Sequence, residues 1–146
     1  MQRPKFIPPV GEKTYEITDE SLGLPRTVLL LEDDVEFAQL LREYLETCNF
    51  SVTVVPDGVQ GMRRVMEKDF DLIICDLLMP NLPGDMFYLG VERVKPHLSR
   101  RFVFITGHQN NAKILEFTKK VRALTLFKPF EMRLLVETLE VALKNK

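Results

Sequence analysis

The segment Leu72-Ile73-Ile74-Cys75-Asp76-Leu77-Leu78-Met79-Pro80 places a carboxylate directly after four apolar residues. An apolar run this short, followed by a proline-containing stretch, is typical of a strand buried on both faces of a parallel sheet. A charge at the end of such a strand is costly unless it has ionic partners or binds a metal. Asp76 is therefore the first candidate functional residue.

A second acidic segment, Glu32-Asp33-Asp34, follows another apolar run, Val28–Leu31. The carboxyl ends of parallel strands meet at one edge of a sheet, where α/β proteins bind their ligands. Two acidic strand ends in one small domain therefore predict a site for a divalent cation. These acids could also cap the helix that follows, because acidic residues favour helix N-termini. The two roles are compatible.

Short apolar runs alternate with segments of helical periodicity along the rest of the chain. The predicted strands are Val28–Leu31, Ser51–Val55, Leu72–Cys75, Phe102–Ile105 and Leu124–Phe127. The predicted helices are a segment through Phe37 and Leu45, a segment marked by Val59, Met62 and Met66, and then Asp85–Val94, Asn111–Arg122 and Glu131–Lys144. Five strand–helix units predict an α/β fold in which a doubly wound parallel sheet carries helices on both faces.

Length, charge and cysteine content limit the classes of function. The chain has 146 residues, enough for one domain with a substantial core, and a net charge of -1. This charge gives no general attraction to nucleic acids or anionic membranes, and no apolar stretch is long enough for a membrane span. Cys48 and Cys75 lack the CxxC spacing, so we expect reduced thiols in a cytoplasmic protein.

Residues 1–26 differ in composition from the rest of the chain. They contain six proline or glycine residues, namely Pro4, Pro8, Pro9, Gly11, Gly23 and Pro25. We predict an N-terminal arm or linker here and a single domain over residues 27–146. The segments Phe6-Ile7 and Tyr15-Glu16-Ile17 could dock on the domain or on a partner.

Four motifs of this chain, in this order, resemble the receiver domain of two-component response regulators. They are Leu29–Asp34, Asp76–Gly84, Ile105-Thr106-Gly107 and Lys128-Pro129-Phe130, and the resemblance covers about residues 27–146. It implies a flavodoxin-like (βα)5 fold with strand order 2-1-3-4-5, of which a chemotaxis receiver is a known example. It also implies a cis peptide before Pro129, a conformation that X-Pro bonds tolerate.

The resemblance implies a role for each acidic residue. Asp76 corresponds to the phospho-acceptor of the family. Asp33 corresponds to a direct Mg²⁺ ligand, Glu32 to a ligand acting through water, and the backbone carbonyl of Leu78 to a further ligand. Oxygen donors of this kind suit Mg²⁺, and neutralising charge around a transferring phosphoryl group is most of its catalysis.

The resemblance also implies a signalling switch. Thr106 corresponds to the switch hydroxyl and Lys128 to the family's lysine, and both would contact the phosphoryl group and change the surface around the fourth helix, fifth strand and fifth helix. The expected phosphodonor is a sensor histidine kinase or a phosphotransfer protein. An output partner of unspecified identity is expected, and a homodimer is compatible with the pattern. Such a protein is not a conventional enzyme, because it catalyses only its own phosphorylation and dephosphorylation.

Two positions depart from the family pattern and leave alternatives open. Thr125 occupies a position where receivers commonly carry Tyr or Phe, which allows a pseudo-receiver that binds partners constitutively without phosphorylation. Leu78 offers no polar side chain to orient an attacking water, so we expect slow to moderate loss of phosphate. Leu78 also argues against a phosphatase of the haloacid dehalogenase type, which needs a second Asp at this position.

Overall fold

The computed structural model describes residues 5–6, 15–16, 23–108 and 110–145. Strand β1 (Lys5–Phe6) pairs with β2 (Tyr15–Glu16) in an antiparallel ladder. The docking predicted for residues 6–7 and 15–17 concerns side chains outside the described part, so it stays a prediction, as does the arm as a whole. The main sheet begins at Arg26, one residue before the predicted start of the domain.

Five parallel strands form the central sheet. They are β3 (Arg26–Leu31), β4 (Phe50–Val55), β5 (Leu72–Asp76), β6 (Phe102–Thr106) and β7 (Leu124–Phe127). Their order across the sheet is β4-β3-β5-β6-β7, with every neighbouring pair parallel. This is the predicted order 2-1-3-4-5 of the flavodoxin-like fold, which is confirmed.

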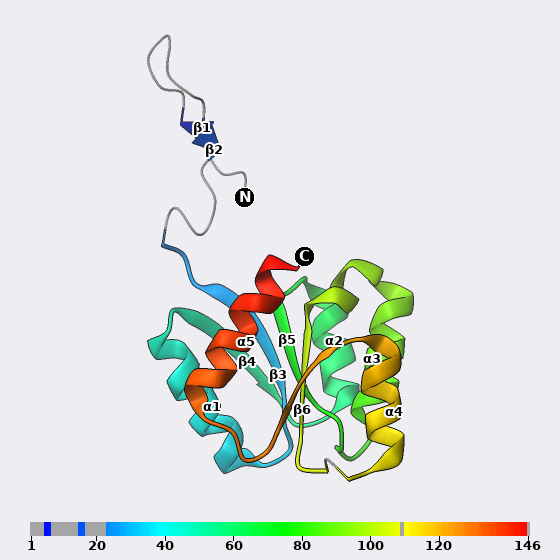
Figure 1. Ribbon diagram of the computed structural model, residues 1–146. Helices are drawn as coiled ribbons and strands as arrows, with labels where there is room; N and C mark the ends of the chain where they lie inside the picture. Colours follow the sequence, from blue (N-terminus) through cyan, green and yellow to red (C-terminus); the bar gives the residue numbers. More distant parts are fainter. Residues whose placement is uncertain (1–4, 7–14, 17–22, 109, 146) are drawn as a thin grey trace.

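Helices cover both faces of this sheet (Figure 1). Helices α1 (Val35–Thr47) and α5 (Met132–Lys144) lie on one face. Helices α2 (Gly58–Glu67), α3 (Gly84–Val94) and α4 (Ala112–Val121) lie on the other. A short 3₁₀ turn, η1 (Pro96–Arg101), follows α3 and was not predicted. None of the described helices combines the length and the apolar character needed to cross a membrane.

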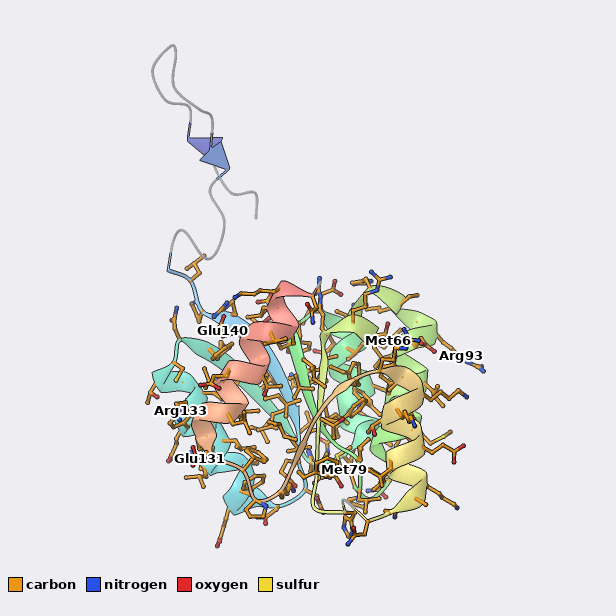
Figure 2. All side chains as sticks on the ribbon, in the orientation of Figure 1. Met66, Met79, Arg93, Glu131, Arg133 and Glu140 are labelled. Carbon is orange, nitrogen blue, oxygen red and sulfur yellow. The ribbon has the colours of Figure 1, made fainter. Side chains whose placement is uncertain are left out.

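The sheet separates two hydrophobic cores, and the packed side chains are visible in Figure 2. Successive residues of β5 alternate between them: Ile73 and Cys75 pack towards α2 and α3, whereas Leu72 and Ile74 pack towards α1 and α5. All five residues of β5 are buried. Burial of each such aliphatic side chain contributes about 1.5–3 kcal/mol. Asp76 is therefore held at the end of a strand that is buried along its whole length.

The second helix, predicted from Val59, Met62 and Met66, is confirmed as α2, but these apolar residues do not form its buried face. Val59 and Met66 are 49% and 62% exposed, and Met66 is labelled in Figure 2. The buried face carries Gly61 and Val65 instead. A Cβ atom at Gly61 would lie 2.6 Å from Leu31 Cδ2, so this helix approaches the sheet through a residue without a side chain. Apolar periodicity cannot reveal a face made partly of glycine.

Asp69 joins the chain after α2 to the residues at the start of η1. Its carboxylate accepts a hydrogen bond from Lys95 Nζ at 2.8 Å and lies 2.7 Å from His97 Nε2. The hydrogen bond from Lys95, followed by that from His97, holds the pKa of Asp69 below its ordinary value. The charged form of Asp69 therefore favours the folded state.

We expect Asp69→Asn to lower the free energy of unfolding at pH 7 by at most about 1 kcal/mol, because exposed ion pairs are screened. A carboxyl group whose pKa is lowered by folding stabilises the folded state at pH values above its unfolded-state pKa of about 3.9. This stabilisation is lost as the pH falls through the folded-state pKa. The difference from wild type should therefore persist at pH 5 and shrink below about pH 4. Urea titrations would measure it. Glu43→Gln is the control, since Glu43 is exposed and bonds the neutral Gln39.

Candidate functional site

Asp76 lies at the carboxyl end of β5 with only 5% of its surface exposed. The backbone N–H of Leu78 donates to Asp76 Oδ1 at 3.0 Å, and Lys128 Nζ donates to Asp76 Oδ2 at 2.9 Å. Both carboxylate oxygens thus have a partner in the chain. Lys128 is thus an ionic partner for the charge at this strand end.

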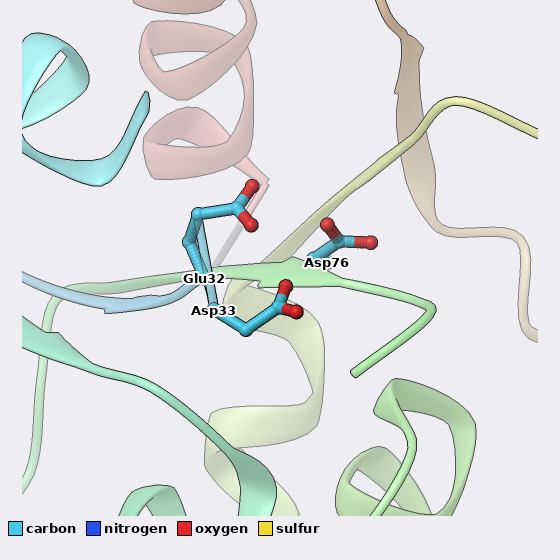
Figure 3. A group of neighbouring side chains, drawn as sticks. All are labelled: Glu32, Asp33 and Asp76. Atoms are coloured by element: carbon cyan, nitrogen blue, oxygen red, sulfur yellow. The ribbon is translucent and has the colours of Figure 1, made fainter. Parts of the chain in front are cut away.

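Three carboxylates converge beside this strand end, as Figure 3 shows. Glu32, Asp33 and Asp76 each offer one oxygen, and these oxygens all lie within 4.8 Å of one another. Ligands of an octahedral Mg²⁺ at about 2.1 Å are separated by at most about 4.2 Å. A small side-chain rotation, or a water between the ion and Glu32, would close the difference. The donor set therefore fits a hard divalent cation.

Lys128 joins two members of this acidic cluster. Its ammonium donates to Glu32 Oε1 at 2.8 Å as well as to Asp76, and its own side chain is 26% exposed. The backbone N–H of Lys128 donates to the carbonyl of Thr106 at 2.8 Å, which fixes the residue at the end of β7. The predicted cis peptide between Lys128 and Pro129 is confirmed. One ammonium thus pairs with two of the three carboxylates.

Burial and charge shift the proton affinities of these groups. Burial raises the pKa of Glu32 to about 7, and the charge of Asp76 adds to the rise, against hydrogen bonds from Lys128 and Asp34. Burial alone would lower the pKa of Lys128, but its hydrogen bonds to Glu32 and Asp76 outweigh this effect and raise it. A cation beside the carboxylates would favour their ionised form.

Thr106 ends β6 next to the cluster and is fully buried. Its hydroxyl accepts a hydrogen bond from the backbone N–H of His108 at 3.1 Å, instead of bonding Asp76 or Lys128. Its carbonyl contacts the backbone of Lys128. The structure thus brings Glu32, Asp33, Asp76 and Lys128 together directly and places Thr106 beside them through the main chain.

The loop from β5 to α3 is held by contacts that the sequence did not reveal. Asn81 Nδ2 donates to Asp57 Oδ2 at 3.3 Å, and Asp57 also caps α2. A Cβ atom at Gly84 would lie 2.5 Å from the carbonyl oxygen of Asp76, so only glycine fits there. Leu78, in the same loop, directs its backbone N–H to Asp76 and leaves its side chain 41% exposed.

Two aromatic residues near Lys128 were also missed. The Lys128 ammonium lies 4.7 Å from the centre of the Phe37 ring, and the Phe130 ring packs against Phe37 with an edge contact at 6.1 Å. Phe37 lies in the first turn of α1, three residues after the N-cap Asp34. In the sequence, the helical spacing of Phe37 indicated only that it packs into the core. Nothing in the spacing indicated a contact with Lys128.

Comparisons with known proteins agree with this architecture. The profile of the family described as "Response regulator receiver domain" matches residues 28–140. The transcriptional regulatory protein RprY of Bacteroides fragilis is 32% identical over 118 residues, which is 81% of this chain and 49% of RprY. The response regulator receiver protein CpdR of Brucella abortus is 30% identical over 115 residues, covering 79% of this chain and 94% of CpdR. The chain thus spans nearly all of CpdR but about half of RprY.

Solved structures show the same fold. A CheY-like response regulator receiver domain protein from Methanospirillum hungatei has a TM-score of 0.75 at 19% identity, covering 82% of this chain and 94% of that one. CheY4 of Vibrio cholerae has a TM-score of 0.72 at 24% identity, covering 81% and 98%. Receiver domains are signalling domains that interact with histidine kinases or phosphotransfer proteins and generally bind Mg²⁺ in an acidic pocket. On its matched profile, its relatives and its fold, this chain belongs to the family of response regulator receiver domains.

Proposed function

We propose that this receiver domain accepts a phosphoryl group on Asp76 in a Mg²⁺-dependent reaction, with a histidine kinase or a phosphotransfer protein as donor. The observation that carries the proposal is the convergence of Asp76 with Glu32, Asp33 and Lys128 at one strand edge. Lys128 offsets only part of the negative charge of the buried Glu32 and Asp76 and the exposed Asp33, and uncompensated buried charge is costly. A site built to receive a cation accounts for it.

The carboxylates of Glu32, Asp33 and Asp76 would hold Mg²⁺, together with the backbone carbonyl of Leu78. Bound there, Mg²⁺ would neutralise charge on the oxygens of the transferring phosphoryl group. The Asp76 carboxylate attacks phosphorus, the bond from phosphorus to the donor nitrogen breaks, and an acyl phosphate forms on Asp76. The Lys128 ammonium supplies further positive charge beside the reacting oxygens.

The acyl phosphate would act as a switch by offering new acceptors. The Thr106 hydroxyl would leave the N–H of His108, and Lys128 would turn from the carboxylates to the phosphoryl oxygens. Because the backbone of Lys128 bonds the carbonyl of Thr106, the two responses are mechanically linked. We propose that they alter the surface formed by α4, β7 and α5, where an output partner or a second copy would bind.

Incubation with phosphoramidate or acetyl phosphate and Mg²⁺, followed by intact-mass measurement, tests the proposal. We expect a single phosphoryl adduct on the wild-type protein, its absence when a chelator replaces Mg²⁺, and its assignment to the peptide that contains Asp76. A wild-type protein that gains no mass under these conditions, or gains it equally in chelator, contradicts the proposal.

Thr125 supports a second candidate, a pseudo-receiver that binds partners without phosphorylation. Its hydroxyl donates to the carbonyl of Ala123 at 3.3 Å, and it supplies no aromatic ring for the usual relay. The intact acidic cluster favours phosphorylation over this alternative. Failure of the adduct to form would reverse that preference.

The location and limits of the domain are part of the same proposal. We propose a cytoplasmic protein with a receiver over residues 27–146 and an arm over residues 1–26. A reducing compartment would keep the two cysteines, Cys48 and Cys75, as thiols.

Leu78 gives an expectation for the lifetime of the phosphorylated state. Its exposed apolar side chain, two residues after Asp76, cannot orient an attacking water, so we expect Leu78→Asn to shorten the lifetime roughly tenfold, a modest effect for a positioned polar group. Intact mass at timed intervals after removal of the phosphodonor measures it. Leu89→Asn, an equally exposed leucine at 41% on α3, is the control. A wild-type half-life of seconds would argue against this role of Leu78.

A further inference from the structure

The Lys128 ammonium has a third neighbour besides the two carboxylates. The Phe37 ring lies with its centre 4.7 Å from Lys128 Nζ, well inside the distance of about 6 Å within which a cation is attracted to an aromatic face. Phe130, two residues after Lys128, packs against Phe37 at 69° between the ring planes. The Phe37 ring of α1 thus borders the ammonium, and Phe130, from the segment before α5, packs against that ring.

The position of this ring is fixed by the same segment that carries the acidic residues. Asp34 caps α1, and its Oδ1 accepts the backbone N–H of Phe37 at 3.1 Å. Glu32 Oε2 in turn accepts the backbone N–H of Asp34 at 3.1 Å. Phe37 is half-buried against the core shared by α1 and α5. The carboxylate of Glu32 and the ring of Phe37 are therefore two supports for Lys128 within one short, hydrogen-bonded stretch.

An aromatic ring and a carboxylate hold the Lys128 ammonium in different ways. The lysine stem has four flexible carbons, and 26% of the side chain is exposed, so the ammonium could turn into solvent when Asp76 becomes phosphorylated. A carboxylate holds the ammonium by direct hydrogen bonds that must break before it can bond the phosphoryl group. A π face attracts the charge without occupying its N–H donors in this way.

We propose that Phe37 is a positioning residue for phosphoryl transfer: its ring keeps the Lys128 ammonium beside Asp76 while the ammonium changes acceptors. This inference rests on the proposed phosphorylation of Asp76. It also identifies an aromatic partner of the site in a chain that carries Thr125 where a strand aromatic is usual. The partner lies on α1, on the opposite face of the sheet from α4.

Replacement of Phe37 by mono-, di- and trifluorinated phenylalanine tests the proposal, because fluorine weakens the negative ring face with little change in size. The rate of adduct formation with phosphoramidate and Mg²⁺, followed by intact mass, should fall stepwise along the series, by about three- to tenfold in total. Phe37→Leu should show a similar fall, and Phe37→Tyr should retain most of the wild-type rate. Urea titrations check that the variants remain folded.

A spectroscopic measurement separates positioning from general packing. The ε-methylene resonances of Lys128 should show an upfield ring-current shift in the wild type and in Phe37→Tyr, and should lose it in Phe37→Leu. Tyr44→Leu, which removes another half-buried ring from α1, should change neither the shift nor the rate. A phosphorylation rate that is constant across the fluorinated series overturns the inference and leaves the function of Asp76 intact. Absence of an adduct on the wild type overturns both.

Discussion

The Asp76→Asn protein should gain no phosphoryl group under conditions that modify the wild type. An amide has nearly the shape of the carboxylate, and its oxygen can still accept the N–H of Leu78, but it is not a nucleophile for phosphorus. Intact mass after incubation with phosphoramidate and Mg²⁺ measures the result. An adduct of wild-type extent on Asp76→Asn would rule out Asp76 as the acceptor.

Asp33→Asn is the matched control for this experiment. It removes one negative charge from the same cluster and leaves the proposed acceptor in place. We expect its adduct to form more slowly and to need a higher Mg²⁺ concentration, because one of the oxygen ligands is weaker. If neither variant formed an adduct, the experiment would show only that the acidic cluster is required, and it would not identify Asp76 as the acceptor.

The same Asp76→Asn change should not destabilise the fold. It removes one of three converging carboxylates, and Glu32 keeps its hydrogen bond from Lys128 at 2.8 Å. We expect the free energy of unfolding in chelator to be equal to that of the wild type or higher. Substitutions in a functional site often have this effect, here because the carboxylates of the site repel one another. A fall of more than about 1 kcal/mol would show that the Asp76–Lys128 pair stabilises the native state on balance.

Lys128→Met should lower the rate of phosphorylation about a hundredfold or more, the usual cost of removing one group that stabilises developing charge. It should also lower the free energy of unfolding by about 3 kcal/mol, because Glu32 and Asp76 would be left buried without their cation. Protonation of Glu32, whose pKa is about 7, limits this loss near neutral pH. The phosphorylation rate and the unfolding free energy are measured separately.

Mg²⁺ separates the two effects of Lys128→Met. Addition of Mg²⁺ should restore part of the lost stability, since a ligand that binds only the native state stabilises it, while the rate should stay low. Lys119→Met, on the exposed surface of α4, should change neither quantity. A phosphorylation rate of Lys128→Met within about twofold of the wild-type rate would show that Lys128 has no role in phosphoryl transfer.

The sheet was predictable because its central strands are buried on both faces. In a chain that alternates strands with helices, a continuous apolar run such as Leu72–Cys75 is too short for a helix and long enough for a buried strand. The strand ends were less certain: β5 and β6 include Asp76 and Thr106, which the apolar pattern excluded because a polar residue ends the run. The face of α2 that contacts the sheet was not predicted, because Gly61, which has no side chain to detect, makes this contact.

The acidic residues were predicted by their places at strand ends, which meet at one edge whatever the side-chain conformations. Lys128 was predicted by the resemblance to receiver domains. The contacts among them were not predictable in the same way. That Lys128 bridges Glu32 and Asp76, that Phe37 lies over its ammonium, and that Asp57 holds Asn81 all depend on rotamers and loop paths. Sequence spacing carries no information on these choices.

Cys75 gives the phospho-acceptor strand a built-in chemical reporter. Its thiol is fully buried one residue before Asp76, and burial raises its pKa well above the ordinary value. A thiol reagent can therefore modify it only when β5 separates from its neighbours, whereas the half-buried Cys48 is accessible in the native state. The ratio of the two labelling rates would report how often this strand opens, with and without a phosphodonor, in a protein of unaltered sequence.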